Sequence, residues 1–252
     1  MTNYSTNISN SQWQVISKFV DSKRIRKYDL REVINAILYL VKTGCQWRLL
    51  PGDFPKWQMV FYYFNSWKKK EIWKQVHDEL VKLTRKKAGR KPSPTAGIID
   101  SQSVKATLVS CQSKGYDAGK KIKGVKRHIL VDTLGLVLAV IIHSASVQDR
   151  SGAVLAIECM IKQWKRIKLI FADGGYSGAL IKSIKQQYKI TIEIIKRNEL
   201  HQFKILPKRW IVERTFAWID AHRRNSKYYE RLDDTGTAMV HIASMRVMLN
   251  RL

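Results

Sequence analysis

The chain has 252 residues, of which 45% are hydrophobic, so it is long enough to bury the core of one large domain or two modest ones. Its 46 lysines and arginines outnumber its 20 aspartates and glutamates and give a formal net charge of +26. This excess goes beyond what solubility requires and predicts a polyanionic partner, with nucleic acid ahead of an anionic membrane surface. The sequence has no run of 18 or more apolar residues, no signal peptide and no lipidation motif, so we expect no membrane partner.

The cysteine pattern argues against a zinc site or a disulfide framework. Cys45, Cys111 and Cys159 are odd in number, widely spaced and form no CxxC pair, and the six histidines are scattered. We therefore expect a reduced, cytoplasmic protein in which any metal ligands are carboxylates.

Residues 1–86 are predicted to form a small helical N-terminal domain. Apolar residues recur at helical spacing over residues 30–44, with Asp29 placed to cap the helix and Gly44 placed to end it. Residues 57–87 predict one or two further helices. Short helices, tight turns and a basic surface fit a helix-turn-helix-like DNA-binding domain, and a plain helical bundle remains the alternative. Most of the tryptophans in this region are expected in the core: Trp47, Trp57, Trp67 and Trp73.

A basic linker over residues 87–96, which contains two prolines, leads into a second domain over residues 97–252. This domain is predicted to begin with a short strand that ends at Asp100, and a later strand is predicted to end at Asp173. Asp149 is placed to cap a helix between them. The alternation of elements predicts an α/β fold with a mixed sheet and helices on both faces. The expected ranges are strands at 96–100, 126–132, 136–144, 169–172 and 189–197, helices at 150–164 and 178–188, and two helices after residue 209.

Three carboxylates in this domain are candidates for a metal site. Asp100 and Asp173 each end a predicted strand, and if the two strands are parallel neighbours, both acids emerge at the same end of the sheet. Glu213 lies in a later helix among bulky apolar residues. Three convergent carboxylates suit two divalent cations, Mg²⁺ or Mn²⁺, which can catalyse an in-line phosphoryl displacement. Simpler interpretations stay open at this point: Asp173 only starts a turn, and Glu213 pairs with a nearby arginine on an outer face.

Five motifs in one order resemble a known family over nearly the whole chain. They are WRLLPGDFPKW, GIIDSQSVKA, KRHILVDTLGL, FADGGYSG and IVERTFAWIDAHRR. Together they resemble bacterial insertion-sequence transposases of the insertion-sequence-5 type, which are DDE enzymes with an RNase H-like core.

The resemblance implies an RNase H-like mixed sheet with flanking helices, preceded by the small helical domain. It implies Asp100, Asp173 and Glu213 as the catalytic, metal-binding triad. It also implies Mg²⁺-dependent cleavage at the ends of a mobile element, followed by joining of the 3′-hydroxyl ends to target DNA.

The sequence departs from this pattern around Glu213. The broader related group carries a tyrosine, an arginine, the glutamate and a lysine at fixed spacing. Arg209 stands four residues before Glu213, as the pattern requires, but Leu206 occupies the tyrosine position and Asp220 the lysine position.

Two other basic groups are candidates for DNA contacts. If the helix of Glu213 continues, Arg224 lies eleven residues later near the same face, and it or Arg223 is expected to contact a phosphate in place of the missing lysine, with a solvated helix end as the alternative. The glycine-rich loop over residues 115–128 is expected to bind phosphates, with a solvated loop as the alternative. Its basic residues are Lys120, Lys121, Lys123, Lys126 and Arg127.

The favoured function is a DNA transposase that acts on double-stranded DNA, both the element ends and the target. We expect a homo-oligomer on DNA, because two ends must be paired, and association with the nucleoid. A non-catalytic DNA-binding protein or repressor derived from a transposase is the alternative. An RNase H-like nuclease without a joining step is a third possibility.

Overall fold

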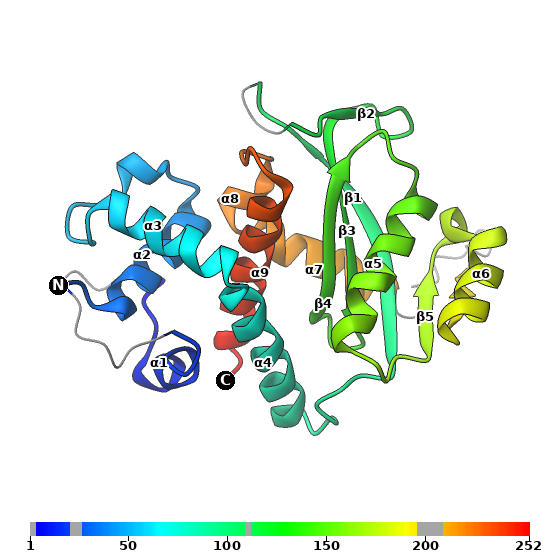
Figure 1. Cartoon of the computed structure of the whole chain (residues 1–252), viewed down its shortest axis with the longest axis horizontal. Helices are drawn as coiled ribbons and strands as arrows, with labels where there is room; N and C mark the ends of the chain where they lie inside the picture. The colour runs from blue at the N-terminus through cyan, green and yellow to red at the C-terminus, as the bar shows by residue number, and fades with distance from the viewer. Residues whose placement is uncertain (1–3, 21–26, 109–111, 196–208) are drawn as a thin grey trace.

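The computed structural model describes residues 4–20, 27–108, 112–195 and 209–252, and its central element is a mixed β-sheet with helices on both faces (Figure 1). The strands are β1 (Ala96–Lys105), β2 (Gly115–Asp117), β3 (Ile122–Asp132), β4 (Val137–Ser144), β5 (Leu169–Ala172) and β6 (Thr191–Ile194). β1 pairs antiparallel with β3, and β3 pairs antiparallel with β4 and β2. On its other edge β1 pairs in parallel with β5, which pairs in parallel with β6. The predicted mixed sheet is confirmed.

Helices from the second half of the chain cover the two faces of this sheet. One face carries α5 (Asp149–Gln163) and α6 (Ala179–Tyr188), and the other carries α7 (Arg209–Asp220) and α9 (Asp233–Leu249). Alternation along β1 divides the core accordingly, because Ile98 packs with the α7 side and Ile99 with the α5 side. A polar residue in β1 therefore faces one helical layer or the other according to its position in the strand.

The N-terminal region is helical, as predicted. Its helices are α1 (Asn10–Ile16), α2 (Leu30–Thr43), α3 (Trp57–Lys69) and α4 (Ile72–Lys87), with a short 3₁₀ turn η1 (Trp47–Leu49). Asp29 caps α2 by accepting a hydrogen bond from the Arg31 amide at 2.9 Å, and Gly44 ends α2 in the left-handed region at φ 74°. Of the four tryptophans expected mostly in the core, Trp67 and Trp73 are buried, whereas Trp47 and Trp57 are only partly buried.

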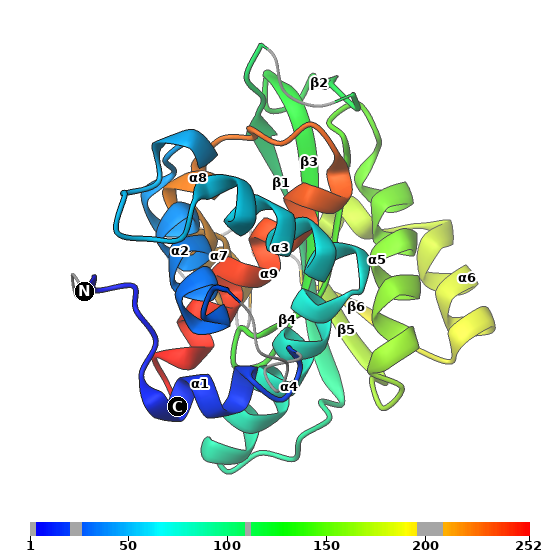
Figure 2. The ribbon, with the colours of Figure 1, turned by 60° about the vertical axis from the view of Figure 1, so that its left-hand side comes forward.

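The N-terminal helices and the sheet are joined through α9. This helix packs against α2, α4, α7 and β4, and it lies between the N-terminal helices and the sheet (Figures 1 and 2). One hydrophobic cluster runs continuously from Ile8 through α4 and the α5 side of the sheet to Leu249. The division into a helical domain, a linker and a catalytic domain stays a prediction, as does the helix-turn-helix-like function of the helices.

Several expected boundaries are wrong. β1 continues past Asp100 to Lys105, because β3 pairs with it along its whole length. Asp149 is the first residue of α5, and Gln148 occupies the cap position without a side-chain bond. β6 is shorter than expected and ends at Ile194. None of the helices in the described ranges has the length and apolar character that a bilayer crossing requires.

Candidate carboxylate site on the α7 face of the sheet

Asp100 and Asp173 lie at the same level on neighbouring parallel strands. Ile98 of β1 is paired with Phe171 of β5, and each aspartate stands two residues after its strand's member of this pair. Because side chains alternate across a strand, each aspartate continues the side formed by Ile98 and Phe171, which packs against α7. The register of the sheet thus brings the two aspartates to one face.

Glu213 reaches this face on α7. The helix buries Ile211, Val212 and Phe216 against the sheet, which leaves Glu213 at the rim with its side chain 56% exposed. Arg209 lies one turn earlier, with its Nε 3.2 Å from Glu213 Oε1 and its Nη2 3.8 Å from Asp173 Oδ2. A single guanidinium therefore connects the helix acid to the acid after β5, and the simpler interpretation that Glu213 pairs with an arginine also describes this geometry.

The pKa of Asp100 lies above the ordinary value of an aspartate. Burial, together with the negative charge of Asp173, raises the pKa of its carboxyl group to about 6. The Ser101 amide, which donates to Asp100 Oδ1 at 2.7 Å, and the cations Arg209 and Lys120 oppose this rise. The raised value means that the nearby positive charge does not fully compensate an ionised Asp100.

The oxygen atoms of the three carboxylates are suitable ligands for divalent cations, but the carboxylates lie too far apart to hold one ion together. Oxygen ligands are what Mg²⁺ and Mn²⁺ prefer, and the incompletely compensated charge of Asp100 favours an added cation. In the described residues, no three aspartate, glutamate, histidine or cysteine side chains lie close enough together to hold one metal ion as they stand. Arg209 takes the position between Asp173 and Glu213. The donor set thus fits a metal only if Arg209 gives way.

Asp173 also serves the turn that follows it. Its Oδ1 accepts a hydrogen bond from the Gly175 amide at 3.0 Å and caps the 3₁₀ turn η2 (Gly174–Tyr176). Tyr176, only 1% exposed, packs on the α5 side of the sheet and fixes this turn in place. The turn-starting role of Asp173 is therefore present, and it leaves Oδ2 directed towards Arg209.

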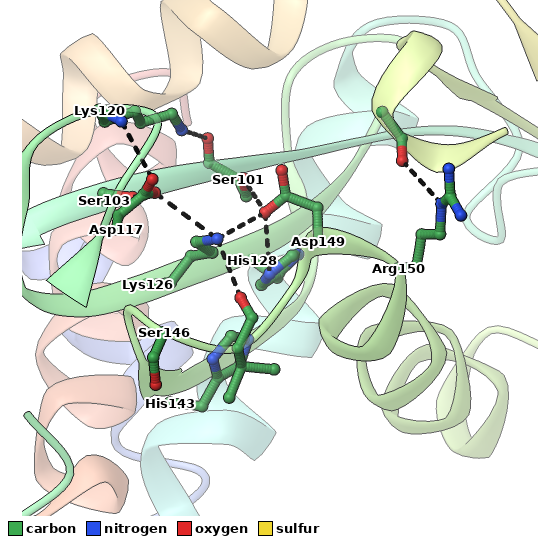
Figure 3. Close-up of polar contacts among 12 residues, drawn as sticks. Ser101, Ser103, Asp117, Lys120, Lys126, His128, His143, Ser146, Asp149 and Arg150 are labelled. Atoms are coloured by element: carbon green, nitrogen blue, oxygen red, sulfur yellow. Dashed lines mark hydrogen bonds and ion pairs between the residues drawn. The ribbon is translucent and has the colours of Figure 1, made fainter. Parts of the chain in front are cut away.

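The opposite face of β1 carries a separate polar group, which we call the α5-side network: Ser101, Ser103, Asp117, Lys126 and Asp149 (Figure 3). Lys126 Nζ lies 2.9 Å from Asp149 Oδ1 and 3.6 Å from Asp117 Oδ2, and it donates to the Val147 carbonyl at 2.9 Å. Ser101 donates to Asp149, and Ser103 donates to Asp117. Lys126 is thus the shared cationic partner of both carboxylates in this network.

The expectation that Lys126 and Arg127 contact phosphates is corrected, because both side chains are buried. Lys126 is 6% exposed and held in the α5-side network, and Arg127 is 1% exposed. Arg127 Nη1 lies 3.3 Å from Asp220 Oδ1, and its Nη2 donates to the Asn225 carbonyl at 2.9 Å. Both side chains point into the protein because they belong to β3, where alternate residues face the two helical layers.

The other basic residues of the loop remain exposed. Lys121 and Lys123 lie on the surface at the β2–β3 turn. Lys120 is exposed too, and its Nζ donates to the Ser101 carbonyl at 3.1 Å, next to Asp100. These three lysines are the members of the predicted set that a phosphate can reach.

Arg224 is not brought to the carboxylates. The expectation assumed a helix that continues past Glu213 for eleven residues, but α7 ends at Asp220 and the chain is extended at His222. Arg224 instead lies in the short helix α8 (Arg223–Ser226), where its Nε pairs with Glu230 Oε1 at 2.6 Å. Arg223 is exposed in the same turn. Leu206, at the tyrosine position of the related group, lies outside the described residues.

Sequence reasoning missed the role of Gln102 and the partners of Asp220. Gln102 Nε2 donates to Asp220 Oδ2 at 2.5 Å, and Gln102 Oε1 accepts from Arg127 at 3.2 Å. Little in the sequence signals either, because residues 100–103 are all polar and show no apolar–polar alternation typical of a strand.

Two family profiles match the chain. The family described as "Transposase DDE domain" matches residues 91–248, and the family described as "Putative transposase of IS4/5 family" matches residues 8–77. A protein of Burkholderia cepacia described as "Putative transposase for insertion sequence element IS402" is 29% identical over 136 residues. That alignment covers 51% of this chain and 64% of the relative, so the chain spans less than two thirds of the length of this relative. The resemblance to DDE transposases is confirmed, and because the first match covers more than half of its 252 residues, the chain belongs to the transposase DDE domain family.

Proposed function

We propose that this protein is a transposase that cleaves the ends of its own insertion sequence and joins them to target DNA. The observation that supports this proposal best is the convergence of Asp100, Asp173 and Glu213 on one face of the sheet, with Arg209 between two of them. Membership of the DDE family gives the convergence its chemical meaning. Double-stranded DNA is the proposed substrate, which implies action at the chromosome.

Each acid has a distinct proposed role. Asp100 and Asp173, fixed by the parallel strands, would hold two divalent cations, Mg²⁺ or Mn²⁺, and Glu213 on α7 would complete the ligand set. Such cations supply Lewis-acid stabilisation of the attacking and leaving oxygens in an in-line phosphoryl displacement. Burial raises the pKa of Asp100 to about 6, so the carboxylate form that would bind a cation predominates above that pH.

Arg209 has a proposed double role. Without a cation it neutralises Asp173 and Glu213, whose side chains are 29% and 56% exposed. When a cation takes over that neutralisation, the guanidinium becomes free to contact a DNA phosphate, which it can do bidentately. Lys120, Lys121 and Lys123 would bind the backbone nearby without reading sequence. The pairing of two element ends would require an oligomer on DNA.

The proposal is tested with the full chain and a DNA fragment that carries the natural flanks of its own gene. Strand breaks are mapped at nucleotide resolution in Mg²⁺, in Mn²⁺ and in EDTA, and joined products are sequenced. The matched variant is Asp173→Asn, because asparagine can still cap the turn at Gly175 while it removes the charge.

We expect discrete metal-dependent breaks at the flanks, loss of these breaks in Asp173→Asn, and unchanged DNA affinity in that variant. DNA binding without breaks in the wild-type protein would instead favour the non-catalytic DNA-binding protein. Breaks without joined products would favour a nuclease that lacks the strand-transfer step.

A further inference from the structure

Asp220 stands where the related group has a lysine, and the structure gives it a buried cation of its own. The carboxylate of Asp220 lies 3.3 Å from Arg127 Nη1 and accepts from Gln102 Nε2 at 2.5 Å. Gln102 also accepts from Arg127 at 3.2 Å, so the three side chains form a closed triangle. We call this triangle the Asp220 anchor.

The Asp220 anchor is held from the interior by Arg127, while the side chain of Asp220 is 34% exposed. Gln102 and Arg127 are direct register partners on β1 and β3, so the sheet fixes their relative position. Arg127 is 1% exposed, and its Nη2 donates to the Asn225 carbonyl beyond the end of α7, while its Nε has no hydrogen-bond partner among the described residues. A buried guanidinium of this kind requires a carboxylate, because an unpaired charge in the interior is strongly unfavourable.

The two ends of α7 are attached to the sheet in different ways. Arg209 at the first turn reaches Asp173 at 3.8 Å, and both side chains are about a quarter exposed, at 24% and 29%. Asp220 at the last turn is tied to Gln102 and Arg127 by shorter contacts, and although its own side chain is 34% exposed, that of Arg127 is only 1% exposed. The N-terminal attachment can therefore exchange, whereas loss of the C-terminal attachment would leave the buried charge of Arg127 without its carboxylate.

The sequence spacing within β1 and α7 connects the Asp220 anchor to the carboxylates. Gln102 follows Asp100 by two residues in β1, so it points to the same face. Asp220 follows Glu213 by seven residues, which is two helical turns. The anchor thus couples the strand of one acid to the helix of another.

We propose that Asp220, Arg127 and Gln102 act as positioning residues that hold α7 on β1, so that Glu213 stays in register with Asp100 when Arg209 leaves the carboxylates. The inference rests on the proposed function for the role of the three acids. In this inference the negatively charged Asp220 binds Arg127, whereas the lysine of the related group would bind a phosphate. A lysine at this position would meet the buried Arg127 instead of DNA.

The test compares Asp220→Asn with Glu230→Gln in the full chain. Each change removes the carboxylate charge beside a buried arginine, but the Arg224–Glu230 pair has no bond to β1 among the described residues. Gln102→Leu is the second variant, because it cuts the anchor from β1 and leaves the Arg127–Asp220 pair intact. The readouts are the dissociation constant for Mn²⁺, measured by electron paramagnetic resonance, and amide hydrogen exchange in residues 209–216.

We expect Asp220→Asn to weaken Mn²⁺ binding about tenfold, as loss of an outer-shell support typically does, and to speed exchange in the first two turns of α7. Gln102→Leu should shift both readouts in the same direction by less. Glu230→Gln should lower thermal stability without changing either readout.

Unchanged exchange in Asp220→Asn overturns the anchor, and so does an equal loss of Mn²⁺ affinity in Asp220→Asn and Glu230→Gln. If Asp173→Asn binds Mn²⁺ as tightly as the wild-type protein does, that result would count against the proposed function instead. The exchange comparison needs no metal, so it decides the anchor in that case too.

Discussion

The two faces of β1 carry two polar groups of opposite character. On the α5 face, Lys126 lies between Asp149 and Asp117. The hydrogen bond and charge of Lys126 hold the pKa of Asp149 below the ordinary value although burial acts to raise it. Burial acts in the same way on Asp117, whose pKa is held below the ordinary value by hydrogen bonds from the Ser103 hydroxyl and the Lys120 amide and then by the charge of Lys126. On the α7 face, burial raises the pKa of Asp100 to about 6. Residues that alternate along β1 thus belong to two kinds of group. On the α5 side the charges of the acids are compensated, which we call closed, and on the α7 side the charge of Asp100 is not fully compensated, which we call open. The open group is the one for which we propose an external cation.

The largest expected effect separates the two faces by activity. Glu213→Gln should lower the single-turnover cleavage rate by about a hundredfold or more, since it removes a proposed metal ligand. Its thermal stability should change little, because the side chain is 56% exposed. Asp149→Asn should do the reverse, with a lower melting temperature and a cleavage rate close to the wild-type value. Equal rate losses in the two variants would contradict the distinction between the faces.

A second expected effect separates the faces by pH. Because the folded pKa of Asp100 lies above its ordinary value, its contribution to stability is present below about pH 4 and is lost as the pH rises through about 6. Asp100→Asn should therefore equal the wild type near pH 4 and exceed it by about 3 kcal/mol at pH 8, measured by urea unfolding in EDTA.

Asp149 provides the opposite sign for that experiment. Its folded pKa lies below the ordinary value, so the advantage of the wild type over Asp149→Asn should be present above about pH 4 and lost as the pH falls further. Parallel stability profiles for the two variants would show that the two carboxylates do not differ as described.

The smallest expected effect concerns the loop lysines and DNA. Lys121→Ala or Lys123→Ala should each reduce the slope of log affinity against log salt by about 1, since each would remove one phosphate contact. Lys126→Met should leave this slope unchanged while it lowers the free energy of unfolding, because it leaves Asp149 and Asp117 without their cation. Fluorescence anisotropy over a salt series measures all three variants. A reduced slope in Lys126→Met would mean that the buried lysine becomes exposed on DNA.

The sequence predicted the order of most elements, β2 excepted, and the site of three acids stays a prediction; it did not predict which polar side chains were already paired. The length of β1 was missed because Ser101 and Ser103 face inward among polar partners, which hides the apolar alternation of a strand. Arg127 was read as a loop cation, although its partner Asp220 lies 93 residues away in sequence and becomes visible only in the fold.

The end of α7 was the other limit. Helical periodicity placed Arg224 beside Glu213, but periodicity cannot indicate where a helix stops unless a glycine or proline marks the point. Here His222 ends it with an extended backbone and a bond from its ring to the Trp218 carbonyl. The local sequence pattern thus predicted on which face of the sheet each acid lies. Whether a lysine or arginine is free to contact DNA depends on its long-range partners, which only the structure shows.

The position of α9 has a consequence for how the chain folds during synthesis. α4 and α2 bury their apolar sides against α9, which is made only after the whole sheet has been translated. At 5–20 residues per second, roughly 10–30 seconds separate the emergence of α4 from that of α9. During this interval the apolar sides of the early helices lack their native cover, so we expect the nascent chain to depend on chaperones, and the N-terminal helices to reach their final arrangement only when α9 has left the ribosome.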